Sequence, residues 1–280
     1  MKDKIYKYSY PALSDKDFGW FRISGPGLAN CLFYTAQAYI FAEINNCKLI
    51  SPTWFKFSIG PWIRKERDKR VYDHLFKTKG KAGITKAFII SPINPFKNRI
   101  KKFNSLGNYF VDLLSHHELV LKMLSEMINP KAIEKVREKD LKDVIAVHVR
   151  LGDYLPHLRV DIDWYKKIIE NIIKINPNQK IYIFSDGTDE EISPLLINEN
   201  VKRAFYGNAL ADIWAISKTK LVIASDSTFS AWGAFIGKIP IVFSKRHFPP
   251  IYNGQIPEFV LGDTTDIPES IKLIIYEKRI

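Results

Sequence analysis

The second half of the chain alternates short apolar runs with amphipathic segments, and this alternation restricts the possible folds more than any other feature of the sequence. The apolar runs are continuous and rich in β-branched residues, which is typical of strands in a parallel sheet covered on both faces. Strand–helix alternation of this kind predicts an α/β fold with a doubly wound, Rossmann-like sheet. The predicted strands are Val144–Val149, Ile181–Ser185, Val201–Ala204, Leu221–Ala224 and Pro240–Phe243, with helices at Trp164–Lys174, Glu190–Ile197, Ala209–Ser217 and Phe229–Ile236 between them.

The first half of the chain has a weaker pattern and a different charge balance. Residues 1–142 hold 26 Lys and Arg against 13 Asp and Glu, whereas residues 143–280 hold 16 against 17. Because this break coincides with the change of pattern, we place a domain boundary after residue 142. The elements predicted before it are a strand at Trp20–Ser24, a helix ending near Asn45, a strand at Lys48–Ser51, and helices at Glu118–Met127 and Lys131–Lys139.

The basic excess of the first half gathers in two clusters, Arg64–Arg70 and Lys97–Lys102. Such a field attracts polyanions, whether nucleic acid, an anionic lipid surface or a phosphorylated substrate. The alternative interpretation of these clusters is a solvated face that keeps the protein in solution. The clusters show no helix-turn-helix, zinc-finger or RNP pattern, so we expect no nucleic-acid partner, although a basic nucleic-acid-binding protein stays as an alternative.

Cysteine content and apolar stretches bear on the compartment. The chain has two cysteines without the spacing of a zinc site, which favours a reducing compartment. The uncharged stretch Ile23–Ala42 contains Gly25, Pro26 and Asn30 and is too polar to span a membrane. The first ten residues carry charge but no apolar segment of the kind found in signal peptides. We therefore expect a soluble cytoplasmic protein.

The sequence VIAVHVRLGDY, from Val144 to Tyr154, carries the strongest sign of a binding site. Alternate side chains of a strand share a face, so His148 and Arg150 project together at its carboxyl end. In open α/β sheets ligands bind at that edge. Arg150 can present a bidentate fork to a phosphate, and Gly152 allows the backbone to turn sharply. A structural ion pair between Arg150 and Asp153 is the alternative.

Polar side chains also follow two other predicted strands. Ser225-Asp226-Ser227-Thr228 comes after Leu221–Ala224 and begins a helix, where hydroxyls serve as N-caps and where N–H groups also bind phosphate. Asp186 follows Ile181–Ser185 and either holds a guanine edge or ribose or caps a helix. The glycine turn in SGPGLANCLF, Ser24 to Phe33, lacks the full G-x-G-x-x-G pattern and is a weak dinucleotide signature.

The chain contains one D-x-D sequence, Asp161-Ile162-Asp163, a pattern that binds a metal in one class of sugar-transferring enzymes. Here it comes just before the predicted helix Trp164–Lys174. Aspartates at that position cap the helix and oppose its dipole, and we favour this interpretation.

Three segments together resemble glycosyltransferase family 11, the α1,2-fucosyltransferases. HVRLGDY resembles the family's H-x-R-x-G-D segment, DIWAISKTKLVIASDSTFSAWGA its serine-rich second segment, and GPGLANCLFYTAQAYIFA its opening G-G-L-G-N-Q-M-F element. They occur in the family's order, within residues 20–245. The chain departs from the family at Ala29, Cys31, Leu151, Asp226 and Ala231, which bears on the identity of the sugar and the acceptor.

The resemblance implies a GT-B architecture, with two Rossmann-like domains facing a cleft. GDP-fucose would lie mainly on the second domain, residues 143–280, and the acceptor would enter from the first, residues 1–142. By the same resemblance Arg150 would bind the diphosphate and His148 would support it. Ser227, Thr228 and Phe229 would cradle the phosphates and ribose, and Asn30 would reach the cleft.

This donor chemistry implies a mechanism without a metal or other cofactor. Negative charge grows on the departing phosphate, where Arg150 and the helix start at Ser227 can stabilise it. The acceptor hydroxyl attacks from the opposite face and needs a general base, for which Asp153 and His157 are the candidates. A glycan on a lipid diphosphate would bring the protein to the inner face of the membrane. A sugar-nucleotide-binding module without catalysis remains an alternative.

Overall fold

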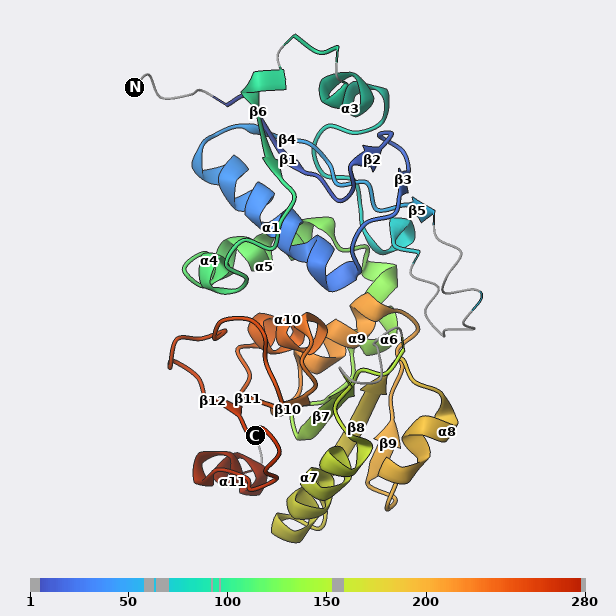
Figure 1. Cartoon of the computed structure of the whole chain (residues 1–280), viewed down its shortest axis with the longest axis vertical. Helices are drawn as coiled ribbons and strands as arrows, with labels where there is room; N and C mark the ends of the chain where they lie inside the picture. Colours follow the sequence, from blue (N-terminus) through green and yellow to red (C-terminus); the bar gives the residue numbers. More distant parts are fainter. Residues whose placement is uncertain are drawn as a thin grey trace. The chain divides into compact units, whose positions relative to one another are not determined.

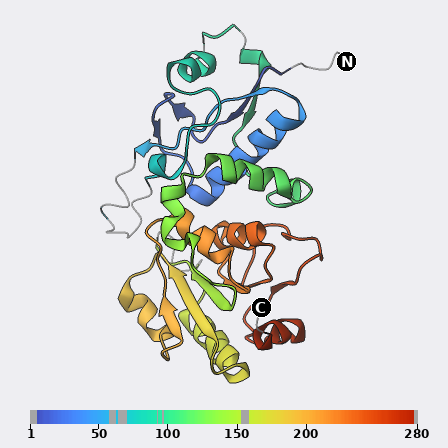
Figure 2. The same cartoon turned by 180° about the vertical axis from the view of Figure 1, so that it is seen from behind.

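The computed structural model describes residues 6–57, 63, 71–91, 93–95, 97–152 and 159–277. These residues form two compact units, one up to Ala132 and one from Ile133 onward (Figures 1 and 2). The division comes earlier in the chain than the change of charge after residue 142. Helix α6 (Glu134–Arg137) lies between the two positions and packs on α9 (Ala209–Ile216) of the second unit.

The second unit is built on a six-stranded sheet in which every neighbouring pair is parallel. Its order is β12-β11-β10-β7-β8-β9, which is the doubly wound Rossmann order 3-2-1-4-5-6. The predicted alternation is therefore confirmed. The strands are β7 (Val144–Val149), β8 (Lys180–Ser185), β9 (Val201–Arg203), β10 (Leu221–Ala224), β11 (Ile241–Phe243) and β12 (Glu258–Val260).

Helices follow the strands of this unit in the expected sequence. The chain folds into α7 (Ile162–Ile175), α8 (Asp189–Ile192) with the short 3₁₀ turn Ser193–Leu195, α9, α10 (Thr228–Gly237) and α11 (Glu269–Tyr276). Strand β12 and helix α11 have no counterpart in the sequence prediction, which stopped at Phe243.

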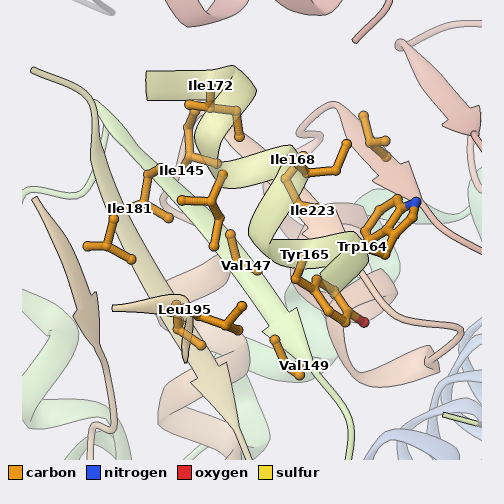
Figure 3. Close-up of a cluster of buried hydrophobic side chains, with 14 of the residues drawn as sticks. Ile145, Val147, Val149, Trp164, Tyr165, Ile168, Ile172, Ile181, Leu195 and Ile223 are labelled. Atoms are coloured by element: carbon orange, nitrogen blue, oxygen red, sulfur yellow. The ribbon is translucent and has the colours of Figure 1, made fainter. Parts of the chain in front are cut away.

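The core of the second unit lies between β7 and α7. Every residue of β7 is buried, and Ile145, Val147 and Val149 share the face that receives Ile168 and Ile172 of α7 (Figure 3). Burying one such side chain contributes about 1.5–3 kcal/mol. Because side chains alternate along a strand, the same geometry places His148 on the opposite face of the sheet.

The first unit contains a smaller parallel sheet and a second, mixed one. Strands β4 (Lys48–Leu49), β1 (Tyr8–Pro11) and β6 (Ile100–Phe103) form the parallel sheet in that order, and α1 (Leu28–Ile44) packs on β1. The sequence prediction found α1 and β4, and a strand within Trp20–Ser24 and a helix at Glu118–Met127 are also present, but it missed β1 and β6. The other elements are β2 (Lys16–Asp17), β3 (Arg22–Ile23), β5 (Lys56–Phe57), the 3₁₀ turns Asp73–Leu75, Lys97–Arg99 and Pro130–Ile133, and helices α3 (Gly83–Ile90), α4 (Val111–Leu114) and α5 (His117–Met127).

The long uncharged stretch Ile23–Ala42 lies mostly within α1, whose 17 residues include eleven buried ones. Among the described residues, no helix combines the length and hydropathy needed to cross a membrane. The basic run at Lys97–Lys102 is partly built into β6, where Lys102 pairs with Asp15. The cluster at Arg64–Arg70 lies outside the described residues.

Candidate functional site: the carboxyl edge of β7 and β10

Strands β7 and β10 are neighbours, and the direction in which the sheet is wound reverses between them. His148 of β7 is in register with Ala224 of β10, so the residues that follow both strands meet at one edge. Ligands of open α/β sheets bind where the strand order reverses in this way. The topology therefore brings together the segment at Arg150 and the segment at Ser225–Thr228, which lie far apart in the sequence.

His148 is buried beneath this edge. Its Nδ1 lies 3.1 Å from Oγ of Ser230 and 3.3 Å from Oγ of Ser225, and its ring stacks on Phe229 at 4.9 Å between centroids. The pKa of His148 is lowered to about 3, mainly by burial; the charge of Asp186 opposes this effect and the positive charge of Arg150 adds to it. The imidazole is therefore neutral at physiological pH.

Ser230 has polar neighbours on two sides. Its Oγ lies 3.1 Å from Nδ1 of His148 and donates to the carbonyl oxygen of Ser227 at 3.3 Å. His148 thus joins the end of β7 to the first turn of α10. Ser230 was not singled out from the sequence, although it follows the N-cap Ser227 by three residues, a spacing that places both on one helix face.

Arg150 follows β7 and forms an ion pair with Asp186, its NH1 group lying 2.5 Å from Oδ2. The other oxygen of Asp186 accepts the backbone N–H groups of Leu151 at 2.9 Å and Gly152 at 3.1 Å. A Cβ at position 152 would lie 2.3 Å from Oδ2 of Asp186, so a larger residue there would displace this carboxylate. Asp186 thus positions both the guanidinium and the turn that follows it.

Asp186 was expected either to contact the nucleotide or to cap a helix. It does not cap α8, because Thr188 is the N-cap of that helix and forms a capping box with Glu191. The alternative partner of Arg150, Asp153, lies outside the described residues.

Helix α10 begins at the same edge. Ser227 is its N-cap and accepts the N–H of Phe229 at 3.2 Å. The first turn contains no acidic side chain, so no carboxylate within the helix opposes the positive end of its dipole. A helix start of this kind, beside an arginine at the end of the neighbouring strand, is suited to bind a phosphorylated ligand.

A second contact ties the end of β10 to the loop after β11. Oδ1 of Asp226 lies 2.6 Å from Nδ1 of His247 and accepts the backbone N–H of His247 at 3.0 Å. Asp226 is one of the positions at which the sequence departs from the family pattern. Its partner comes 21 residues later, and no sequence motif connects the two.

A cavity of about 400 Å³ opens beside the turn that carries Gly152. Arg159 lies in its wall, donating to the carbonyl oxygen of Gly152 at 3.3 Å and pairing with Glu191 at 3.3 Å. The volume of the cavity falls within the range typical of sites for small ligands. The other lining residues are Leu151, Val160, Asp161 and Ile162.

Asp161 is the N-cap of α7, and its side chain accepts the N–H of Asp163 at 2.9 Å. The capping interpretation of the D-x-D sequence is therefore confirmed. Within the described parts of the chain, no three His, Cys, Asp or Glu side chains are grouped as metal ligands would be.

The remaining predicted site residues lie elsewhere. Asn30 is half-buried in the first turn of α1, in the first unit. Both candidates for the general base, Asp153 and His157, lie outside the described residues. The described site is therefore formed by His148, Arg150, Asp186 and the start of α10.

Comparisons with known proteins agree with this architecture. The doubly wound second unit, together with the parallel sheet of the first, defines a GT-B-type α/β fold, as expected. A model of glycosyl transferase family 11 matches residues 85–241, more than half of the chain. The chain belongs to this family.

One curated relative is the O-antigen biosynthesis glycosyltransferase WbnK of Escherichia coli. It is 27% identical over 175 residues, which cover 55% of this chain and 58% of the relative. The match therefore spans less than two thirds of that protein.

Two solved structures match most of the chain. One is a mutant of FUT1 from Arabidopsis thaliana in complex with GDP, which is 12% identical. The match covers 89% of this chain and 72% of the FUT1 chain, with a TM-score of 0.51. The other is the fucosyltransferase NodZ from Bradyrhizobium, also 12% identical. The match covers 80% of this chain and 94% of the NodZ chain, with a TM-score of 0.46.

Proposed function

We propose that the chain transfers fucose from GDP-fucose to a glycan hydroxyl, with inversion at the anomeric carbon and without a metal ion. The observation that carries this proposal is that Arg150 and the start of α10 both follow strands that end at one edge, β7 and β10. Both features offer positive charge to one region. The family motifs favour GDP-fucose as the donor.

The proposed chemistry places negative charge where these groups lie. The bond between the anomeric carbon and the phosphate oxygen breaks, and the electron pair stays on the GDP leaving group. Arg150 would stabilise that charge through its fork of N–H donors, and the start of α10 through the positive end of its helix dipole. Asp186 supports this role because it orients Arg150 before the donor binds.

The acceptor hydroxyl would attack from the face opposite the phosphate and lose its proton to a base. His148 is poorly suited to this step, because it is buried and its pKa is lowered to about 3. Asp153 and His157 remain the proposed bases, and Asn30 of the first unit is proposed to contact the acceptor or donor.

The acceptor is proposed to be a glycan of a bacterial surface polysaccharide, either free or lipid-linked. The name of the E. coli relative, an O-antigen biosynthesis enzyme, supports this class of acceptor. A lipid-linked acceptor would place the protein in the cytoplasm, peripheral to the inner face of the membrane.

A transfer assay with purified protein tests the proposal. GDP-fucose is incubated with a panel of galactose-terminated oligosaccharides, and acceptor-dependent GDP release is measured in the presence of EDTA. The anomeric configuration of the product is then read by NMR. Release of GDP with formation of an α-fucoside, the inverted product of the β-linked donor, is expected. A retained configuration, or turnover of UDP-sugars instead of GDP-fucose, would contradict the proposal.

A further inference from the structure

Strands β3 and β5 of the first unit turn their apolar face outward. In β3 the side chain of Arg22 is 0% exposed, whereas Phe21 and Ile23 on either side of it are exposed. In β5 Phe57 is 62% exposed and Phe55 is also exposed, with the less exposed Lys56 between them. Side chains of a strand alternate between two faces, so here the basic face is turned inward and the apolar face outward.

The buried contacts of Arg22 fix this orientation. Its Nε donates to the carbonyl oxygen of Thr53 at 2.9 Å, and NH1 donates to that of Ser24 at 2.7 Å. NH2 lies 3.4 Å from Sγ of Cys31 in α1. A shift of β3 by one residue would bury the apolar face but break all of these hydrogen bonds. The outward apolar face is therefore a property of the folded unit.

The exposed side chains are close to one another. Ile23 is in register with Lys16 of β2 and with Phe57 of β5, so the three share one face of the small sheet. The rings of Phe18 and Phe21 stack at 4.9 Å between centroids. Lys16 is thus a basic side chain beside apolar ones on the outward face.

Helix α3 extends this surface. A Cβ on Gly83, at the start of α3, would lie 3.6 Å from Nε1 of Trp20, which is itself 58% exposed. Ile84 and Phe88 are 77% and 63% exposed and, being four residues apart, lie on one side of the helix. Figure 1 shows α3 beside β2 and β3 in the first unit. We call Trp20, Phe21, Ile23, Phe57, Ile84 and Phe88 together the aromatic surface.

We propose that the aromatic surface inserts into the headgroup region of an anionic lipid bilayer. Large exposed apolar patches mark interaction sites, and Trp and Phe beside Lys are typical of side chains at a membrane interface. Lys16 lies on the same sheet face, Lys81 is exposed just before α3, and Lys97 and Arg99 are exposed after it.

Charge favours a bilayer over a second copy of the chain as the occupant. Residues 1–142 hold 26 basic against 13 acidic side chains, so two copies meeting at this surface would place like charges against each other. An anionic lipid surface would be attracted by the same charges. This proposal does not depend on the donor site, because no residue of the aromatic surface belongs to the second unit.

Vesicle sedimentation tests the proposal. The triple variant Trp20→Ser/Phe57→Ser/Phe88→Ser should bind vesicles of phosphatidylcholine and phosphatidylglycerol at least about tenfold more weakly than the wild type. The control Ile44→Ser/Leu273→Ser/Tyr276→Ser removes side chains that are 59%, 61% and 64% exposed elsewhere, and it should bind like the wild type. All proteins should bind GDP equally, which also shows that they are folded.

A single substitution gives an independent readout. Vesicles that contain brominated lipid should quench the tryptophan fluorescence of the wild type, and Trp20→Phe should lose most of that quenching while it still sediments with vesicles. Undiminished binding by the triple variant, or absence of binding by the wild type, would overturn the proposal. A wild-type dimer that the triple variant dissociates in sedimentation velocity would also overturn it and assign the surface to a second copy.

Discussion

Arg150 and Asp186 form the pair on which the donor site depends. One carboxylate holds the guanidinium through Oδ2 and the following turn through Oδ1, so the arginine is oriented before any ligand arrives. Preorganised charge of this kind stabilises a transition state without reorganisation at the moment of reaction. The planar fork of arginine, and not only its charge, should therefore matter at position 150.

Replacing Arg150 by lysine should be nearly as damaging as replacing it by alanine. A lysine cannot serve Asp186 and a diphosphate with two parallel donors. Steady-state kinetics with GDP-fucose should show kcat/KM reduced by about 30- to 1000-fold in both variants, a loss of roughly 2–4 kcal/mol. Arg137→Ala, at an exposed arginine of α6, is the control and should keep full activity. A folded Arg150→Ala protein with wild-type turnover would remove this residue from the mechanism.

His148 should make the protein sensitive to acid. Its pKa is about 3 in the folded state and about 6.5 in the unfolded chain, so between these values only the unfolded chain binds the proton. Stability is complete above pH 6.5 and falls as the pH decreases, by about 2 kcal/mol between pH 6.5 and 5. In urea unfolding, His148→Gln should lose less stability than the wild type between pH 7 and 5. An identical pH dependence of the two proteins would contradict the neutral, buried imidazole.

At the scale of elements, two helix starts illustrate how similar sequences serve different purposes. Both α7 and α10 begin with a capping side chain, Asp161 in one and Ser227 in the other. In α7 the cap and the first turn are acidic, which neutralises the dipole. In α10 the cap is a neutral hydroxyl and no acidic residue follows in the first turn, so the dipole can act on a ligand.

Removing the cap of α10 should affect both stability and donor binding. Ser227→Ala should cost about 1 kcal/mol of unfolding free energy, as should Thr188→Ala at the cap of α8. Only Ser227→Ala should also weaken the binding of GDP, by about tenfold, because a hydrogen bond to a charged group contributes about 1.5 kcal/mol or more. Calorimetric titration of GDP into both variants measures this. An equal GDP affinity of the two variants would limit Ser227 to capping.

The acidic start of α7 should be dispensable for catalysis. Asp161→Ala should cost about 1 kcal/mol of stability through loss of the cap, while kcat/KM changes little. Activity should also persist in excess EDTA, because the proposed mechanism meets the diphosphate charge with Arg150 and α10. Loss of activity on chelation that Mn²⁺ or Mg²⁺ restores would show that Asp161 and Asp163 bind a metal.

At the scale of the whole molecule, the sequence predicted the second unit well and the first unit poorly. Strands β7 and β10 were placed at their observed bounds, because a strand buried on both faces leaves a continuous apolar run. Strand β1 contains tyrosines and a proline, and β6 lies in a basic run, so neither carries that signal. In β3 and β5 the apolar face is turned outward, which reverses the usual pattern, so the sequence did not predict this orientation either.

The candidate site was predictable in its positions but not in its contacts. The ends of parallel strands gave His148, Arg150, Asp186 and Ser227 as residues of one edge. The pairing of Arg150 with Asp186, and of Asp226 with His247, depends on how neighbouring strands are aligned, which spacing alone does not reveal.

The central claim is that the edge of β7 and β10 binds the diphosphate of a guanine nucleotide through Arg150. Thermal unfolding of the wild type and Arg150→Ala with GDP, UDP, CMP and dTDP tests it most directly. A ligand at about 100 times its Kd stabilises the native state by roughly 2.7 kcal/mol, which raises the melting temperature by several degrees. We predict this shift for GDP with the wild type and its loss in Arg150→Ala. An equal shift in both proteins, or a shift with UDP and none with GDP, would contradict the account.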